Sequence, residues 1–299
     1  MKSLTKGYLC GAVAAVSYGT NPLFAVPLYE QGLSVGSVLF YRYVLATLIL
    51  GLVMVYRRSS FAVTRRQAML LVLEGVLFGM SSVGLFESYR YMDVGIASTM
   101  LFVEPVMIAV LLWVFWRERV SLRTIAAIAV SLVGVVFLAN PGEGANVSAI
   151  GVTLVLLSSL SYALYMILIN KTSLERLPGV TLTFWSLLFG NLVMIAKVGF
   201  FTELQPIPAN ALAIGSALGL SIFPTIVSIL TVAVAVQLVG SVPTAILGAL
   251  EPVTGVAVGV LVFGEVMTLR VAAGIVLILV AVTVLVTGKR GQRQSPSAD

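Results

Sequence analysis

The sequence has no histidine and only one cysteine, Cys10, among its 299 residues. A single cysteine excludes a disulfide framework, and the lack of histidine removes one of the main ligands of protein zinc sites. A serine or cysteine nucleophile also needs a base beside it, and histidine is the usual base. We therefore expect no metal, no cofactor and no enzymatic activity.

Charged residues are scarce as well. They make up 10% of the chain, whereas hydrophobic residues make up 59% and the mean hydropathy is +1.07. A typical soluble domain has about 25% charged residues, so this composition predicts an integral membrane protein. The net charge of +6 does not indicate nucleic-acid binding, because the basic residues lie in short clusters between apolar runs.

Ten apolar runs are long enough to cross a bilayer, which takes about 20 residues in a helix. We expect helices at residues 4–27, 34–56, 67–90, 94–116, 121–139, 149–170, 178–201, 209–238, 241–263 and 268–288. The connections are too short to hold a domain. The first run follows Lys2 and Lys6 but ends without a cleavage site, so we expect it to be retained. The predicted fold class is an all-α integral membrane protein with ten transmembrane helices.

Lysine and arginine are unevenly distributed over the connections. If the N-terminus is cytoplasmic, most of the 18 basic residues fall on cytoplasmic connections, as at 57–66, 117–123 and 171–176. Such an asymmetry is typical of membrane proteins. We therefore expect both termini in the cytoplasm, and a polar, disordered cytoplasmic tail at residues 289–299.

The chain contains an internal repeat. Residues 97–139 align without a gap on residues 244–286. The alignment pairs Glu104 with Glu251, and it pairs the two prolines that directly follow these glutamates. Both segments are rich in the same apolar residues, but that composition alone would not readily align both glutamate–proline pairs at once. The chain therefore resembles a duplicated unit.

The repeat divides the chain into a first five-helix unit at residues 1–144 and a second at residues 145–288. Because five is odd, the second unit enters the membrane from the opposite side. This predicts an inverted repeat with a pseudo-two-fold axis in the membrane plane, the arrangement on which alternating access is commonly built.

Glu104 and Glu251 lie deep within apolar runs. Each is about ten residues from a helix end, which at 1.5 Å per residue places it ~15 Å deep, near the bilayer midplane. Pro105 and Pro252 each remove a backbone N–H, so a carbonyl one turn earlier loses its partner. Acids at this depth are costly and usually line cavities, so we expect each pair to present a carboxyl group and an unpaired carbonyl to a solute pathway. The alternative is that both glutamates only hold the two units together.

Arg42 is a basic residue inside a predicted helix. The same rise per residue places it close to the level of Glu104, and its counterpart in the repeat is Ser186. We therefore expect Arg42 to pair with Glu104, which leaves Glu251 without a basic partner. Glutamates outnumber arginine within the predicted helices, and this favours a positive or zwitterionic solute, or a proton.

Other polar or aromatic residues of the predicted helices are candidates for lining the same cavity: Tyr18, Tyr162, Glu74, Glu87, Asn21 and Trp185. Further helix breaks are expected at Pro22 and Pro224. Tyr18 and Tyr162 occupy matching positions of the repeat. For the aromatic residues the alternative is a place in the core or in the aromatic belt at the membrane interface.

Three segments carry a resemblance to a known family: "FYRYVLATLIL" at 40–50, "YMDVGIASTMLFVEPVMIAVLLWVFWRERVSL" at 91–122 and "SVPTAILGALEPVTGVAVGVLVFGEVMTL" at 241–269. Together with the repeat, they are similar to the drug/metabolite transporter superfamily, of the EamA type, over essentially the whole chain. That family commonly has Gly-Glu-Arg after the fourth and ninth helices. Here the first copy has Arg117 in place of the glycine, and the second has Val266 in place of the arginine.

The resemblance implies a central cavity between the two units and, most often, export of a small metabolite across a bacterial inner membrane. Family members often lack the glutamate that is Glu104 here, so the resemblance assigns it no role. We expect the solute to be a small polar metabolite, with amino acids first. Multidrug or organic-cation efflux is the alternative. Apart from the solute and the lipid bilayer we expect no partner, and the oligomeric state stays open.

Overall fold

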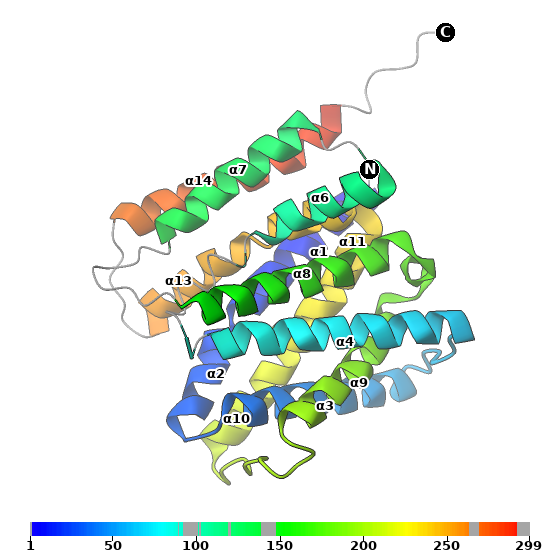
Figure 1. Cartoon of the computed structure of the whole chain (residues 1–299), viewed down its shortest axis with the longest axis vertical. Coiled ribbons are helices and arrows are strands. Elements are labelled where there is room, and N and C mark those ends of the chain that lie inside the picture. The colour runs from blue at the N-terminus through cyan, green and yellow to red at the C-terminus, as the bar shows by residue number, and fades with distance from the viewer. Residues whose placement is uncertain are drawn as a thin grey trace.

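The computed structural model describes residues 2–88, 90–91, 101, 103–118, 121–138, 148–262 and 269–291. All regular structure within these residues is helical, and the helices form an elongated bundle (Figure 1). Six helical segments are long and apolar enough to cross a membrane: Ser3–Glu30, Val35–Tyr56, Arg65–Ser88, Ala149–Lys171, Gly179–Lys197 and Ala211–Val239. Shorter apolar helices accompany them. The chain is therefore an all-helical membrane protein.

The helices follow the chain in the order predicted. The first predicted unit contains α1 (Lys2–Gly19), α2 (Asn21–Glu30), α3 (Val35–Tyr56), α4 (Arg65–Ser88), α6 (Glu104–Trp116) and α7 (Leu122–Leu138). The second contains α8 (Ala149–Lys171), the 3-10 helix η1 (Ser173–Arg176), α9 (Gly179–Lys197), α10 (Ala211–Ser221), the π-helix η2 (Ile222–Val227), α11 (Ser228–Val239), α12 (Ser241–Leu247), α13 (Leu250–Val262) and α14 (Leu269–Gly291).

The six long segments agree closely with predicted spans. For example, α3 at 35–56 matches the span 34–56, and α8 at 149–171 matches the span 149–170. Residues 94–100 and 102, in the first half of the span predicted at 94–116, lie outside the described residues, as does most of the tail predicted at 289–299. The count of ten crossings therefore stays a prediction.

Prolines accompany the interruptions of the helices. Pro22 lies in the first turn of α2, directly after the break between α1 and α2, and Pro105 lies in the first turn of α6. Pro252 follows the short break between α12 and α13, and Pro224 lies within η2. A proline is tolerated in the first turn of a helix because its missing N–H would have no partner there. In the interior of a long segment, as at Pro224, it distorts the helix instead.

Several contacts between helices have a counterpart in which the roles of the first and second units are interchanged. α4 packs against α8, and the counterpart contact, between α11 and α1, is present as well. Likewise α4 packs against α9, while α10 packs against α3. α7 and α14, which correspond to each other in the repeat, lie side by side (Figure 1). A pseudo-two-fold relation between the units would produce this pattern.

α4 and α9 approach closely because glycines lie between them. A Cβ on Gly75 would lie 2.8 Å from the carbonyl oxygen of Ser186, and one on Gly79 would lie 2.9 Å from the Cβ of Val193. Small residues four apart allow this kind of close helix packing in membranes. The G-x-x-x-G pair of α4 is therefore used within the chain.

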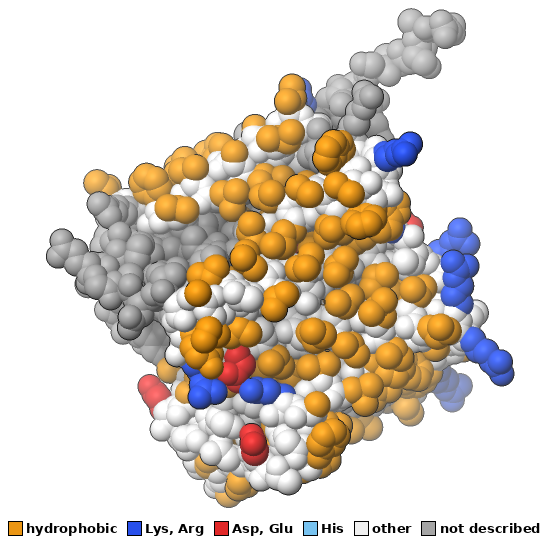
Figure 2. Space-filling model, in the orientation of Figure 1, with side chains coloured by type: hydrophobic (Ala, Val, Ile, Leu, Met, Phe, Trp, Pro, Cys, Tyr) orange, Lys and Arg blue, Asp and Glu red, His pale blue; other side chains and the backbone are white. Residues whose placement is uncertain are grey.

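Charge and apolar surface are separated on the molecule. Hydrophobic side chains cover the flank between the two ends. Lysines and arginines gather mainly at one end, and a smaller group lies beside acidic side chains toward the other (Figure 2). The connection between α3 and α4, with the exposed Arg57 and Arg58, lies at the more basic end, as does the start of α4 with the exposed Arg65 and Arg66. α1 begins and α14 ends there as well (Figure 1). An apolar flank between polar ends is the surface that a bilayer requires.

Candidate functional site

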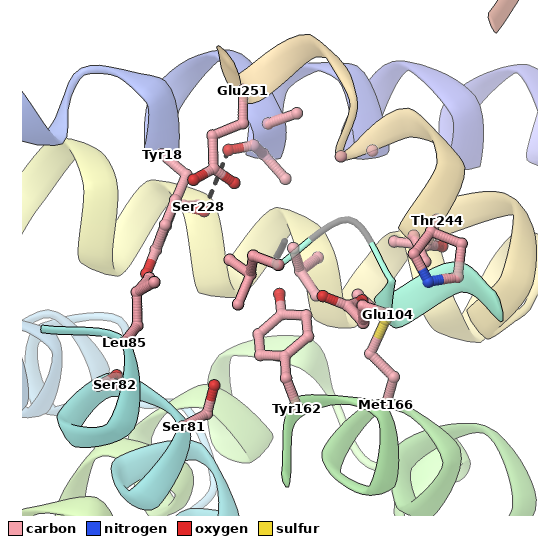
Figure 3. A pocket seen from close by; sticks show the side chains of 18 residues that line it. Tyr18, Ser81, Ser82, Leu85, Glu104, Tyr162, Met166, Ser228, Thr244 and Glu251 are labelled. Carbon is pink, nitrogen blue, oxygen red and sulfur yellow. Dashed lines mark hydrogen bonds between the residues drawn. The ribbon is translucent and has the colours of Figure 1, made fainter. Parts of the chain in front are cut away.

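A cavity lies between helices of both units (Figure 3). Residues of α1, α4 and α6 line it from the first unit, and residues of α8, α11, α12 and α13 line it from the second. It holds about 720 Å³ of empty space, including the part at its opening.

Two carboxyl groups reach the cavity from matching positions of the repeat. Glu104 lies in the first turn of α6 and Glu251 in the first turn of α13, and both side chains are half-buried. A helix N-terminus carries partial positive charge, which favours a carboxylate in the first turn. Within the part of the chain that the structure describes, neither glutamate forms an ion pair. The cavity is therefore suited to a cationic group or a proton.

Tyr18 and Tyr162 also face the cavity, one from each unit. Tyr162 points from α8 toward the space into which both glutamates project (Figure 3). The matching tyrosines and the matching glutamates thus meet at one site, as their positions in the repeat predict.

Arg42 does not pair with Glu104, contrary to the sequence-based expectation. Its Nε donates to the hydroxyl of Thr225 at 2.7 Å, and its Nη2 donates to the carbonyl of Pro224 at 3.2 Å. The guanidinium carbon lies 5.3 Å from the centre of the Tyr18 ring. The side chain is 1% exposed and does not line the cavity. Arg42 therefore lies behind Tyr18, where it still acts electrostatically on Glu251.

The π-helix η2 explains this position of Arg42. Pro224 has no N–H for the carbonyl of Leu220, one turn earlier, and the hydroxyl of Thr225 donates to that carbonyl at 2.7 Å instead. The same hydroxyl oxygen accepts the bond from Arg42 Nε. The helix interruption thus supplies two acceptors for the buried guanidinium, whose Nη1 has no hydrogen-bond partner among the described residues.

The carbonyls affected by Pro105 and Pro252 have partners, which corrects the expectation that both would be unpaired. The carbonyl of Leu101 accepts a bond from the Ser159 hydroxyl on α8 at 3.4 Å. The carbonyl of Gly248 accepts one from the backbone N–H of Glu251 at 2.8 Å. Both carbonyls therefore already have a hydrogen-bond partner within the described part of the chain.

Besides Arg42 and Glu74, three further predicted lining residues lie elsewhere. Glu87, near the end of α4, forms ion pairs with Lys197 at 2.5 Å and with Arg90 at 3.3 Å. Trp185 donates its indole N–H to the carbonyl of Phe61 at 3.2 Å. Asn21, which begins α2, is not part of the lining, and its Oδ1 is buried without a hydrogen-bond partner among the described residues.

Sequence reasoning missed the hydroxyl groups of the lining, namely Ser81, Ser82, Ser228 and Thr244. Ser228, for example, donates to the carbonyl of Ala14 at 3.0 Å, a bond between α11 and α1 that Figure 3 shows. Serine and threonine occur throughout apolar helices, so their identity alone carries no signal. The sequence did offer one signal for this lining: the small residues Gly11 and Ala14 recur on the same face of α1 before Tyr18.

The bundle, its apolar flank and a cavity shared by two repeated units define a multi-pass membrane transporter. The model of the EamA-like transporter family matches the chain twice, at residues 5–140 and 149–287. The chain belongs to the EamA-like transporter family, and the resemblance seen in its sequence is confirmed.

Relatives and a solved structure agree with this assignment. The uncharacterized transporter YvbV of Bacillus subtilis strain 168 is 28% identical over 149 residues, which cover 50% of this chain and 47% of that protein. An uncharacterized transporter of Archaeoglobus fulgidus is 26% identical over 151 residues, 50% of this chain and 52% of that one. The chain thus matches about half the length of these curated relatives. A solved crystal structure superposes with a TM-score of 0.79 over 97% of this chain and 99% of its own, at 17% identity, which shows a shared fold.

Proposed function

We propose that the protein exports a small polar metabolite, with amino acids the first class to test, by alternating access through the cavity between inverted repeats. The observation that carries this proposal is the pairing of matched residues: Glu104 with Glu251, and Tyr18 with Tyr162, all on one cavity. In transporters built from inverted repeats the substrate site lies at the interface of the repeats.

The charges around the cavity favour a zwitterion. The two glutamates can accept hydrogen bonds from an ammonium group. The buried guanidinium of Arg42, behind Tyr18, adds a positive charge on one side of the same site. An amino acid carries both complementary groups within a few bonds of each other.

Organic-cation efflux is the second candidate, and a specific observation favours it. No lysine or arginine is among the residues lining the described cavity, which combines two carboxyl groups with two tyrosine rings. Aromatic faces together with carboxylates bind quaternary and lipophilic cations well.

The proposed setting is a bacterial inner membrane with both termini in the cytoplasm. The gathering of lysine and arginine at the end where α1 begins supports this orientation. The export direction is proposed from the resemblance to the EamA type alone.

Counterflow tests the proposal. Purified protein is reconstituted into two sets of liposomes, one loaded with unlabelled amino acids and one with unlabelled lipophilic cations. Each set is given labelled compounds of the class that it contains, with no ion gradient. We expect one group of amino acids to accumulate, and excess of the same compound to abolish the accumulation. Accumulation of lipophilic cations alone would select the second candidate, and no accumulation of either class would overturn both.

A further inference from the structure

Glu118, the glutamate of the Gly-Glu-Arg motif in its first copy, forms an ion pair outside the cavity. Its Oε1 accepts a hydrogen bond from Nζ of Lys171, the last residue of α8. Glu118 follows α6 in the first predicted unit, whereas α8 belongs to the second. The ion pair therefore joins the two units.

The turn that ends α6 places Glu118 beside α8. Arg117, which stands where the motif commonly has glycine, has a φ of 55° and a ψ of 27°. This left-handed conformation is the one that glycine adopts most easily. The backbone N–H of Glu118 then donates to the carbonyl of Leu112 at 3.3 Å, a bond typical of such helix ends. In this chain the first position of the motif ends the helix, and its glutamate reaches the neighbouring helix.

α6 and α8 extend together from the cavity to the basic end of the molecule, the end at which α1 begins (Figure 1). α6 lines the cavity with Glu104 and Pro105 of its first turn, and α8 lines it with Tyr162 and Met166. Lys171 follows Met166 by five residues, which is ~7.5 Å along the helix at 1.5 Å per residue. The ion pair therefore lies beyond the cavity, toward the basic end.

Apolar side chains lie between the cavity and the ion pair. Ile108 and Leu112 of α6 are 0% and 4% exposed, and Ile167 and Ile169 of α8 are 2% and 0% exposed. All four belong to one hydrophobic cluster. A solute that passes between these two helices toward the basic end needs α6 and α8 to separate, and their separation breaks the ion pair as well.

The ion pair is suited to repeated breakage. The side chains of Lys171 and Glu118 are 21% and 46% exposed. Exposed ion pairs add little to stability, because water solvates both groups when they part. In addition, α6 contains no glycine that would bring its backbone against α8.

The ion pair at the other end of the molecule has a different setting. Glu87 of α4 and Lys197 of α9 also join the two units. There, however, Gly75 and Gly79 bring the two helices into close backbone contact. The α4–α9 interface is therefore less able to separate than the α6–α8 interface.

We propose that the Glu118–Lys171 ion pair is a gate contact: it holds α6 against α8 while the cavity is closed toward the basic end, and it breaks when the cavity opens there. The inference rests on the proposed alternating access. A contact present in only one of two states favours that state. Loss of the ion pair should therefore shift the protein toward the state that is open at the basic end.

Access of a reagent to the cavity tests the gate without any solute. In a Cys10→Ser background, Ala15→Cys places a thiol in the cavity lining, and an impermeant thiol reagent is applied to right-side-out and to inverted membrane vesicles. A separate Ala62→Cys protein, with its exposed thiol between α3 and α4, identifies the vesicles that expose the basic end.

Four variants are compared in the background with the cavity thiol. Lys171→Gln and Glu118→Gln each remove one charge of the pair. The double variant Lys171→Glu with Glu118→Lys restores the pair with exchanged charges. Glu87→Gln is the matched control, because it breaks the ion pair between the units at the other end.

We expect each single variant at the gate to speed labelling from the basic side about two- to fivefold, the range that an exposed ion pair allows. The double variant should return to the slow rate, and Glu87→Gln should keep it. High salt should speed labelling of the intact pair, because it screens exposed charges, but should not affect the two glutamine variants. Unchanged rates in both single variants, or a double variant as fast as they are, would overturn the proposal.

Counterflow of the same proteins separates this inference from the proposed function. Solute exchange by wild type, together with unchanged labelling in the single variants, would overturn the gate contact and leave the function intact. Faster labelling in the single variants, without exchange of any solute by wild type, would support the gate contact and overturn the function.

Discussion

At the scale of single residues, the two cavity glutamates are related by the repeat but have different surroundings. Glu251 feels the positive charge of Arg42, whereas the partner acting on Glu104 is Glu251 itself. Glu251 therefore interacts electrostatically with both the guanidinium of Arg42 and the carboxyl group of Glu104. It is the acid on which solute binding should depend most.

Replacing Glu251 by glutamine should abolish transport without unfolding the protein. The side chain is half-buried against the cavity and forms no ion pair in the described part of the chain, so loss of its charge removes a binding contact but no structural partner. We expect counterflow to fall to the level of protein-free liposomes while the thermal unfolding midpoint in detergent stays unchanged. Glu203→Gln serves as control. Counterflow at the wild-type rate in purified Glu251→Gln would refute the assignment.

Arg42 has a structural role that a lysine cannot fulfil. Lysine presents one compact ammonium group and cannot reproduce the separate bonds of Nε to Thr225 and of Nη2 to Pro224. Arg42→Lys should lower the free energy of unfolding by about 1–3 kcal/mol, because a buried acceptor loses its donor. Glu104→Gln should leave it nearly unchanged in the same denaturation assay. Equal destabilisation by both variants would mean that Arg42 and Glu104 form a pair after all.

At the scale of helices, the sequence predicted where the long segments lie and where prolines interrupt them, because apolar length and missing N–H groups are local properties. It did not predict the partners of the interrupted backbone. Rise per residue fixes the depth of Arg42, but not the face of α3 on which it lies, and that face is turned toward η2. Partners such as Ser159 for the carbonyl of Leu101 come from a different helix, and a single segment carries no signal for them.

The π-helix η2 should depend on one hydroxyl. Thr225 replaces the donor that Pro224 lacks and also accepts from Arg42. Thr225→Val keeps the shape but leaves a buried carbonyl and a buried guanidinium N–H unpaired, so we expect destabilisation of about 2–4 kcal/mol. Thr231→Val is the matched control, because the Thr231 hydroxyl also bonds helix carbonyls but replaces no missing donor. The two variants should differ clearly in thermal unfolding; similar midpoints would show that the hydroxyl of Thr225 is dispensable.

At the scale of the whole molecule, the repeat is symmetric in its packing and asymmetric in its buried charges. Arg42 of α3 is held by the segment that includes η2, whereas its counterpart Ser186 of α9 bonds Glu74 of α4. Equivalent interfaces thus hold a buried cation in one case and a buried acid in the other. Residues that match in the repeat, such as Glu104 and Glu251, could be found from the sequence. The placement of a buried cation at one interface and a buried acid at the other could not, because Arg42 and Glu74 each depend on a partner from another helix.

The orientation of the whole molecule can be tested with its single cysteine removed. In a Cys10→Ser background, Ala62→Cys places a thiol at an exposed position between α3 and α4, and Glu203→Cys places one between α9 and α10. If the basic end faces the cytoplasm, an impermeant thiol reagent added to intact cells should label the thiol at position 203 and spare the one at 62. Permeabilised cells should label both. The reverse pattern in intact cells would place the N-terminus outside.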